Sequence, residues 1–150
     1  MRTIAFAALA ALALGVSACT STDKPAAAPP PPPAGPKAEL AVSDQAVRRG
    51  AVIIDKVMME QDGFVVIHET SADGKPVAPG SIGYARVKKG TAEKVVVRLT
   101  KRVKKGSKLI AMLHADTGRM GRYEFGVRSQ AQDKPLMVGN APVVRAFTVQ

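Results

Sequence analysis

The fold of this chain is limited most strongly by the short apolar runs that fill residues 38–150. The runs are rich in valine and isoleucine, and glycine, proline or Asp-Gly pairs such as Asp62-Gly63 separate them. None of them keeps a helical period over three turns, and such punctuation is typical of β-strands joined by turns. We therefore predict strands at residues 38–47, 52–59, 64–69, 82–87, 93–100, 108–114, 123–127 and 143–149.

Side-chain alternation distinguishes two kinds of strand. In residues 93–100, apolar residues at the odd positions 95, 97 and 99 alternate with Lys94, Val96 and Arg98, which predicts one buried and one wet face. Residues 64–68 and 108–114 are apolar on both faces, which suits central strands. This number of short strands predicts an all-β fold, an immunoglobulin-like antiparallel β-sandwich of seven to eight strands. A small closed barrel is the alternative.

A leader precedes this region. Arg2 is followed by an uncharged apolar run at residues 4–16, and the small residues Ser17 and Ala18 precede Cys19, the only cysteine. The run is shorter than the roughly 20 residues of a membrane-spanning helix, and the pattern is that of a secretory signal peptide. Val16-Ser17-Ala18-Cys19 resembles the bacterial lipobox. We predict a lipoprotein signal peptide at 1–18 and lipidation of Cys19; an ordinary signal peptide with a coincidental cysteine is the alternative.

A spacer is predicted at residues 19–37. It holds seven prolines, five of them consecutive at positions 29–33, and so favours extended polyproline II, with docking of a proline-binding module as the alternative. At about 3.1 Å per residue it would hold the β-sandwich domain, residues 38–150, about 50 Å from the bilayer. Thr20, rather than Asp, follows the cysteine. By analogy with Gram-negative sorting, this predicts the outer membrane, facing the periplasm.

The whole chain has a formal net charge of +10, and the positive charge is concentrated in one segment. Residues 88–108 include nine Lys and Arg and a single acid, Glu93. We expect one basic ridge that attracts anionic lipid, lipopolysaccharide or acidic polymers. A solvated hairpin whose lysines prevent edge pairing is the alternative. Nucleic acid is not expected as a partner, because stacking aromatics are few. The predicted ridge consists of Lys94, Arg98, Lys101, Arg102, Lys104 and Lys105.

The only two histidines, His68 and His114, are the candidate metal ligands. Each ends an apolar run, and methionines lie nearby in the sequence, at positions 58, 59, 112 and 120. Imidazole with thioether would suit copper, with zinc as a further candidate, provided that the two strands are neighbours. In the alternative interpretation each histidine is structural and bonds a carbonyl or carboxylate. We find no nucleophile elbow, phosphate loop or paired acid, and therefore predict a non-enzymatic protein without a catalytic cofactor.

Several segments resemble one family along residues 40–150. They are Gly63-Phe64-Val65-Val66-Ile67-His68-Glu69, Gly80-Ser81-Ile82-Gly83-Tyr84, Gly90-Thr91-Ala92-Glu93-Lys94-Val95-Val96-Val97, and Ala111-Met112-Leu113-His114-Ala115-Asp116-Thr117-Gly118 with Tyr123-Glu124-Phe125. Together they resemble a domain of unknown function of secreted and surface-anchored proteins in haloarchaea and some bacteria. The resemblance implies a β-sandwich displayed outside the cell and no known activity. Those relatives are usually acidic, so a function of their surface charge is not expected in this basic chain.

Overall fold

The computed structural model describes residues 37–126 and 128–150, in which all regular structure is β. Within these residues no helix is long and apolar enough to cross a membrane. The predicted signal peptide, Cys19 and the spacer up to residue 36 lie outside the described residues. The strands are β1 (Ala38–Ala41), β2 (Ala51–Met59), β3 (Gly63–Glu69), β4 (Gly83–Val87), β5 (Gly90–Arg98), β6 (Lys108–Ala115), β7 (Met137–Val138), β8 (Ala141–Pro142) and β9 (Val144–Thr148).

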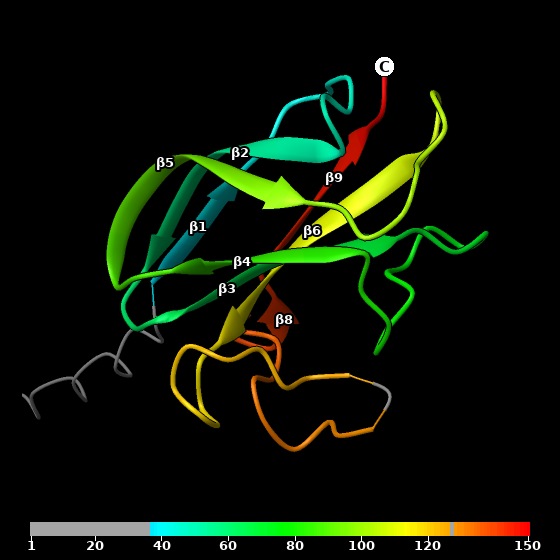
Figure 1. Ribbon diagram of the computed structural model, residues 1–150. Coiled ribbons are helices and arrows are strands. Elements are labelled where there is room, and N and C mark those ends of the chain that lie inside the picture. The colour runs from blue at the N-terminus through cyan, green and yellow to red at the C-terminus, as the bar shows by residue number, and fades with distance from the viewer. Residues whose placement is uncertain (1–36, 127) are drawn as a thin grey trace, which may run out of the picture. The chain divides into compact units, whose positions relative to one another are not determined.

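Two sheets form the body of the domain (Figure 1). One has the strand order β1-β2-β5 and the other β4-β3-β6-β9, while β7 and β8 form a separate two-stranded ribbon. All paired strands are antiparallel. The chain changes sheet between β2 and β3, between β4 and β5, and again between β5 and β6. Such crossings between layers produce an immunoglobulin-like sandwich and confirm the predicted all-β fold.

The core lies between the inner faces of these sheets. Burying an aliphatic side chain of this kind contributes about 1.5–3 kcal/mol, so this layer supplies most of the driving force for folding. The larger members are Leu40, Val52, Ile54, Val57, Met59 and Val97 from one sheet, and Val65, Ile67, Val87, Leu109, Leu113 and Phe147 from the other.

A bend common to β2 and β5 changes which residues of β2 point inward. Val52 and Ile54 are buried before the bend, and Val57 and Met59 are buried after it. On the neighbouring strand β5, Lys94 lies level with this part of β2, and its φ of 51° falls in the left-handed region. Figure 1 shows both strands curving together at this place. Beyond the bend the predicted alternation is confirmed, because Val97 is buried while Val96 and Arg98 are exposed.

Most predicted strands are confirmed, and two predictions need correction. Only residues 38–41 of the predicted strand at 38–47 form a strand. The strand predicted at 123–127 is wrong, because its described part is a loop with one isolated bridge, between Gly126 and Ser129. Its aromatic residues pack side-on against the four-stranded sheet instead of joining it. The β7–β8 ribbon was not predicted, because each of its strands has two residues.

Candidate functional site

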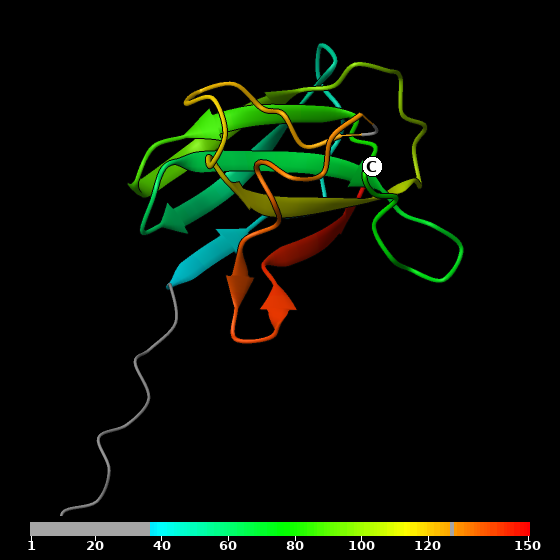
Figure 2. The ribbon, with the colours of Figure 1, turned by 90° about the horizontal axis from the view of Figure 1, so that it is seen from below.

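The outer face of the four-stranded sheet is unusually apolar. On β3 it presents Phe64, Val66 and His68, and all three are buried although they point away from the core. The loop that follows β6, described at residues 116–126 and 128–136, covers part of this face (Figure 2). Its Tyr123 ring lies 5.3 Å from Phe64, and its Phe125 ring lies 5.1 Å from His114, between centroids. The predicted two-sided burial of β3 and β6 is confirmed, and the covering loop is its cause.

Both histidines lie on this covered face and are fully buried. The Nδ1 atom of His68 is 2.6 Å from the carbonyl oxygen of Gly80, and Nδ1 of His114 is 2.6 Å from that of Asp133. A carbonyl oxygen only accepts hydrogen bonds, so in each neutral ring the proton is on Nδ1. Each Nε2 atom therefore carries a free lone pair.

The two imidazoles lie close together. Their centroids are 5.9 Å apart and their planes differ by 24°. Neither Nε2 atom has a hydrogen-bond partner among the described residues, although both atoms are buried. In the β3–β6 register His68 stands opposite Ile110, and His114 stands opposite Phe64. The middle pair on this face is Val66 with Met112, so a buried methionine lies between the two histidines.

Burial shifts the pKa of His114 and of Tyr123. Loss of solvent lowers the pKa of His114 to about 4. The hydrogen bond that its ring donates to the Asp133 carbonyl partly offsets this decrease in the pKa, and the neighbouring His68 adds to it. Burial likewise raises the pKa of the Tyr123 phenol, which stays protonated. His114 is therefore an uncharged imidazole at neutral pH.

The shifted pKa of His114 predicts that the fold loses stability in mild acid. The unfolded chain takes up a proton on this histidine near its ordinary pKa of 6.5, whereas the folded chain does so only near 4. The contribution is complete above pH 6.5 and declines as the pH falls, reaching a loss of roughly 3 kcal/mol near pH 4. Urea unfolding at a series of pH values measures it. His114→Gln, which is neutral throughout and can still donate to Asp133, should remove this part of the loss; an unchanged pH profile would contradict the assignment.

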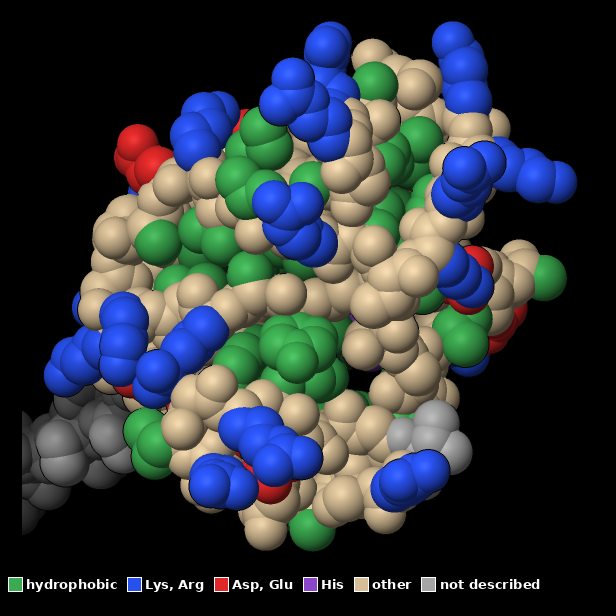
Figure 3. Space-filling view, in the orientation of Figure 1, with side chains coloured by type: hydrophobic (Ala, Val, Ile, Leu, Met, Phe, Trp, Pro, Cys, Tyr) green, Lys and Arg blue, Asp and Glu red, His purple; other side chains and the backbone are tan. Residues whose placement is uncertain are grey.

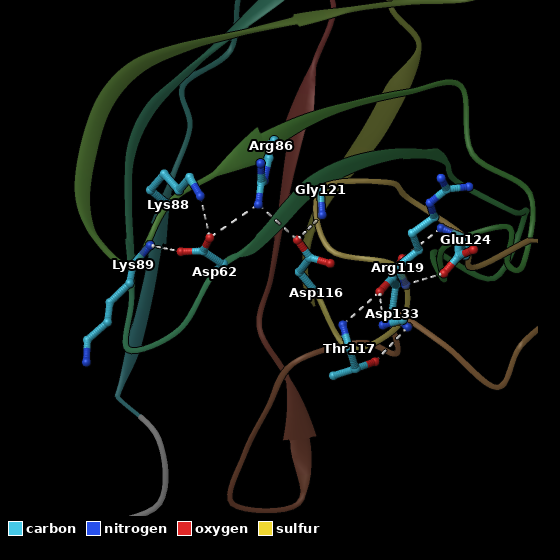
Figure 4. Close-up of polar contacts among 11 residues, drawn as sticks. Asp62, Arg86, Lys88, Lys89, Asp116, Thr117, Arg119, Gly121, Glu124 and Asp133 are labelled. Atoms are coloured by element: carbon cyan, nitrogen blue, oxygen red, sulfur yellow. Dashed lines mark hydrogen bonds and ion pairs between the residues drawn. The ribbon is translucent and has the colours of Figure 1, made fainter.

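Asp133 holds the covering loop in place (Figure 4). Its fully buried carboxylate accepts hydrogen bonds from the backbone N–H groups of Thr117 at 2.9 Å, Gly118 at 3.2 Å and Glu124 at 2.7 Å. Its own N–H donates to the Thr117 hydroxyl at 2.9 Å. One carboxylate thus joins both ends of the segment that carries Tyr123.

Ion pairs fasten the start of the same loop to β4 and to the β2–β3 turn. The Arg86 guanidinium lies 3.4 Å from the Asp62 carboxylate and 3.5 Å from that of Asp116 (Figure 4). Asp116 also accepts the N–H of Gly121 at 2.6 Å. Lys88 pairs with Asp62 at 2.7 Å, and this contact, followed by the backbone N–H of Lys89, lowers the pKa of Asp62. The positive charges of Arg86 and Lys88 are therefore paired with carboxylates of the same domain.

The predicted basic ridge is divided in the structure. Lys94 lies at the bend, where its ammonium is 2.9 Å from Asp55, and this contact lowers the pKa of Asp55. Arg98, at the end of β5, is four residues further on, about 13 Å along an extended strand. Lys101 pairs with Glu69 at 2.6 Å. The remaining members of the predicted ridge, Arg102, Lys104 and Lys105, lie together in the β5–β6 loop.

A groove beside this loop gathers the available positive charge. It has a volume of about 370 Å³, and Glu69 is the only carboxylate among its described lining residues. Figure 3 shows Lys and Arg side chains gathered at the edge where the β5–β6 loop lies in Figure 1. We call this site the basic groove; its lining residues are Glu69, Thr70, Lys101, Arg102, Val103, Lys104, Ser107, Lys108 and Leu109.

A family model described as a domain of unknown function, DUF7282, matches residues 38–150, which include both the histidine pair and the basic groove. The chain belongs to this family. No curated protein and no solved structure matches the chain. The match confirms the resemblance to a domain of unknown function and carries no activity of its own.

The sequence identified part of each site. His68 and His114 converge as expected for neighbouring strands, and Met112 lies between them. The other nearby methionines are elsewhere: Met58 and Met59 belong to β2, and Met120 is 65% exposed on the covering loop. Of the carboxylates that follow the histidines, Glu69 pairs with Lys101. Asp116 has its Oδ2 atom 3.5 Å from Arg86, while its buried Oδ1 atom has no hydrogen-bond partner among the described residues. Among the described residues, no three side chains of His, Cys, Asp or Glu gather as a metal site.

Proposed function

We propose that this chain is a lipid-anchored cell-envelope protein, cut before Cys19, whose sandwich binds phosphate-bearing anionic surfaces through the basic groove. The observation that carries the proposal is the basic groove, where Lys101, Arg102, Lys104 and Lys108 surround one carboxylate. The pairing of Glu69 with Lys101 leaves a net positive site. Clustered cations of this kind attract anionic headgroups by about 1 kcal/mol per residue near a membrane surface.

The position of the groove favours a partner away from the point where the spacer joins the domain. Ala38 pairs with Met59, which in turn pairs with Gly90 at the start of β5. The β5–β6 loop follows Arg98, at the other end of the same strand. Ala38, the first residue of β1, and the basic groove thus lie near opposite ends of β5, as Figure 1 shows for the described residues. This separation leaves the groove accessible to lipid or lipopolysaccharide phosphates.

The test is binding of the protein to vesicles and to lipopolysaccharide. We expect Arg102→Glu/Lys104→Glu/Lys108→Glu to weaken binding to vesicles rich in anionic phospholipid by about 100-fold or more, because three attractive charges of the groove are lost. Lys101 is left in place to keep its pair with Glu69. Cosedimentation at increasing salt measures the affinity, which should fall as the charges are screened.

A variant with the same change of net charge provides the control. Lys89→Glu/Lys134→Glu/Arg145→Glu alters three exposed residues outside the groove and should bind nearly as well as the original protein. Equal loss in both triple variants would show that net charge alone acts and would contradict a groove. Preference for an acidic polysaccharide without phosphate would contradict the phosphate assignment.

A further inference from the structure

We infer that His68, His114 and Met112 form a binding site for one soft monovalent metal ion of the Cu(I) type. This site is separate from the basic groove and does not depend on it. Two buried imidazoles share one face of the sheet, and in the described part of the chain neither Nε2 atom has a hydrogen-bond partner. Buried polar atoms are nearly always hydrogen-bonded, so two such atoms side by side need an explanation.

Both rings are held in the tautomer that a metal requires. A ligating histidine normally donates its second N–H to a carbonyl or carboxylate, which fixes the ring and leaves the other nitrogen for the metal. Here the donors are the Nδ1 atoms, and the acceptors are backbone carbonyls of Gly80 and Asp133. Gly80 lies in the β3–β4 loop, beyond the Glu69 end of β3, whereas Asp133 lies in the loop after β6, at the Gly63 end. The rings are therefore anchored from opposite ends, which directs their Nε2 edges toward the space between them.

The separation of the rings fits one shared ion. With metal–nitrogen bonds of about 2.0–2.1 Å, the ion lies about 3.2 Å from each ring centroid, so two ligating rings are at most about 6.4 Å apart. The observed 5.9 Å falls within that limit and corresponds to an open, bent arrangement, with roughly 135° between the two rings at the ion. Met112, in the middle of the same face, is placed to supply a thioether.

The donor set favours a soft monovalent ion over zinc. Structural zinc takes four ligands from Cys, His, Asp and Glu, and no group of three such residues occurs in the described chain. Thioether and imidazole suit Cu(I), which accepts two or three ligands. The carboxylate of Glu69 pairs with Lys101, and among the described residues that of Asp116 does not group with the two histidines as a metal site. A divalent ion would place two positive charges in this buried site with no carboxylate ligand to balance them. The free-energy cost of burying an ion rises steeply with the magnitude of its charge.

The experiment uses the full chain carrying Cys19→Ser, which removes its only thiol as a competing Cu(I) ligand. Anaerobic titration with Cu(I) against the chelator bicinchoninate should give one bound ion per chain. His68→Gln and His114→Gln should each weaken Cu(I) binding by about 100-fold or more, and Met112→Leu should weaken it by about tenfold. Loss of a residue that only hydrogen-bonds a metal ligand already costs about 10- to 100-fold in affinity, and loss of a ligand itself should cost at least as much. Leucine conserves the buried volume of methionine. Met120→Leu, on an exposed methionine, is the matched control and should bind as the parent does.

Nitrogen NMR of the parent chain decides the question even if a histidine variant fails to fold. On addition of Cu(I), the resonances of both Nε2 atoms should shift together, and by much more than those of the Nδ1 atoms, which keep their protons. X-ray absorption should show two nitrogen ligands and one sulfur ligand, and Met112→Leu should lose the sulfur. Unchanged Cu(I) affinity in both glutamine variants, or unshifted Nε2 resonances, would overturn the inference. Zn(II) binding as tight as Cu(I) binding would overturn the choice of a soft ion.

Discussion

Cys19→Ser is expected to release the protein from the membrane completely. Each buried methylene of an acyl chain contributes about 0.8 kcal/mol, and a single chain gives only reversible attachment, so two or three chains on one residue decide where the protein resides. Serine has no thiol to receive the lipid, and residue 19 is the only cysteine of the chain. Fractionation of cells that produce either protein measures the outcome, together with the mass of the mature amino terminus.

The control for this experiment is Ser17→Ala, which leaves a small residue before the cysteine and should keep both cleavage and anchoring. Density-gradient separation of the membranes tests the predicted outer-membrane location of the parent protein. Membrane attachment of Cys19→Ser at the level of the parent would contradict the lipoprotein proposal. In that case the basic groove would have to hold the domain at the membrane by itself, and high salt would then release it.

The sandwich was predictable because its strands carry their own local signals. Short valine-rich runs with glycine or Asp-Gly boundaries placed β2, β3, β4, β5, β6 and β9 close to their observed positions. The failure at residues 123–127 has a physical cause. Tyr123 and Phe125 have strand-forming side chains, yet their buried area comes from covering a sheet face, a choice that depends on distant residues such as Phe64 and His114.

The candidate sites were predictable in composition and not in geometry. The histidine pair required only that β3 and β6 be neighbours, and their register then places Met112 between the two histidine positions on the same face of the sheet. A single basic ridge would have required a straight β5 and lysines without ion-pair partners in the domain. The bend at Lys94 and the pairs with Asp55 and Glu69 depend on partners 39 and 32 residues away, which no local pattern reveals. The role of Asp133 was missed because its partners are backbone N–H groups, which every residue except proline carries and which no sequence pattern marks.

Asp133→Ala is expected to lower the free energy of unfolding by about 4 kcal/mol, the largest stability change among the predictions for this domain. The carboxylate is 0% exposed and accepts three backbone N–H groups, from Thr117, Gly118 and Glu124. Hydrogen bonds to a charged group contribute about 1.5–3 kcal/mol each, and alanine leaves all three donors without this acceptor. The loss is smaller than the sum because the donors, partly exposed, regain some contact with water.

Two variants separate this role from a general effect of removing a negative charge. Asp44→Ala removes an exposed carboxylate that accepts a single N–H, from Thr148, and should cost about 1 kcal/mol. Asp133→Asn keeps one acceptor oxygen for Thr117 and Gly118 while its amide faces the N–H of Glu124, so we expect an intermediate loss. Urea unfolding orders the three proteins, and hydrogen exchange in residues 116–136 locates the change. Equal stabilities for Asp133→Ala and Asp44→Ala would show that the covering loop is held by its aromatic contacts with Phe64 and His114 instead.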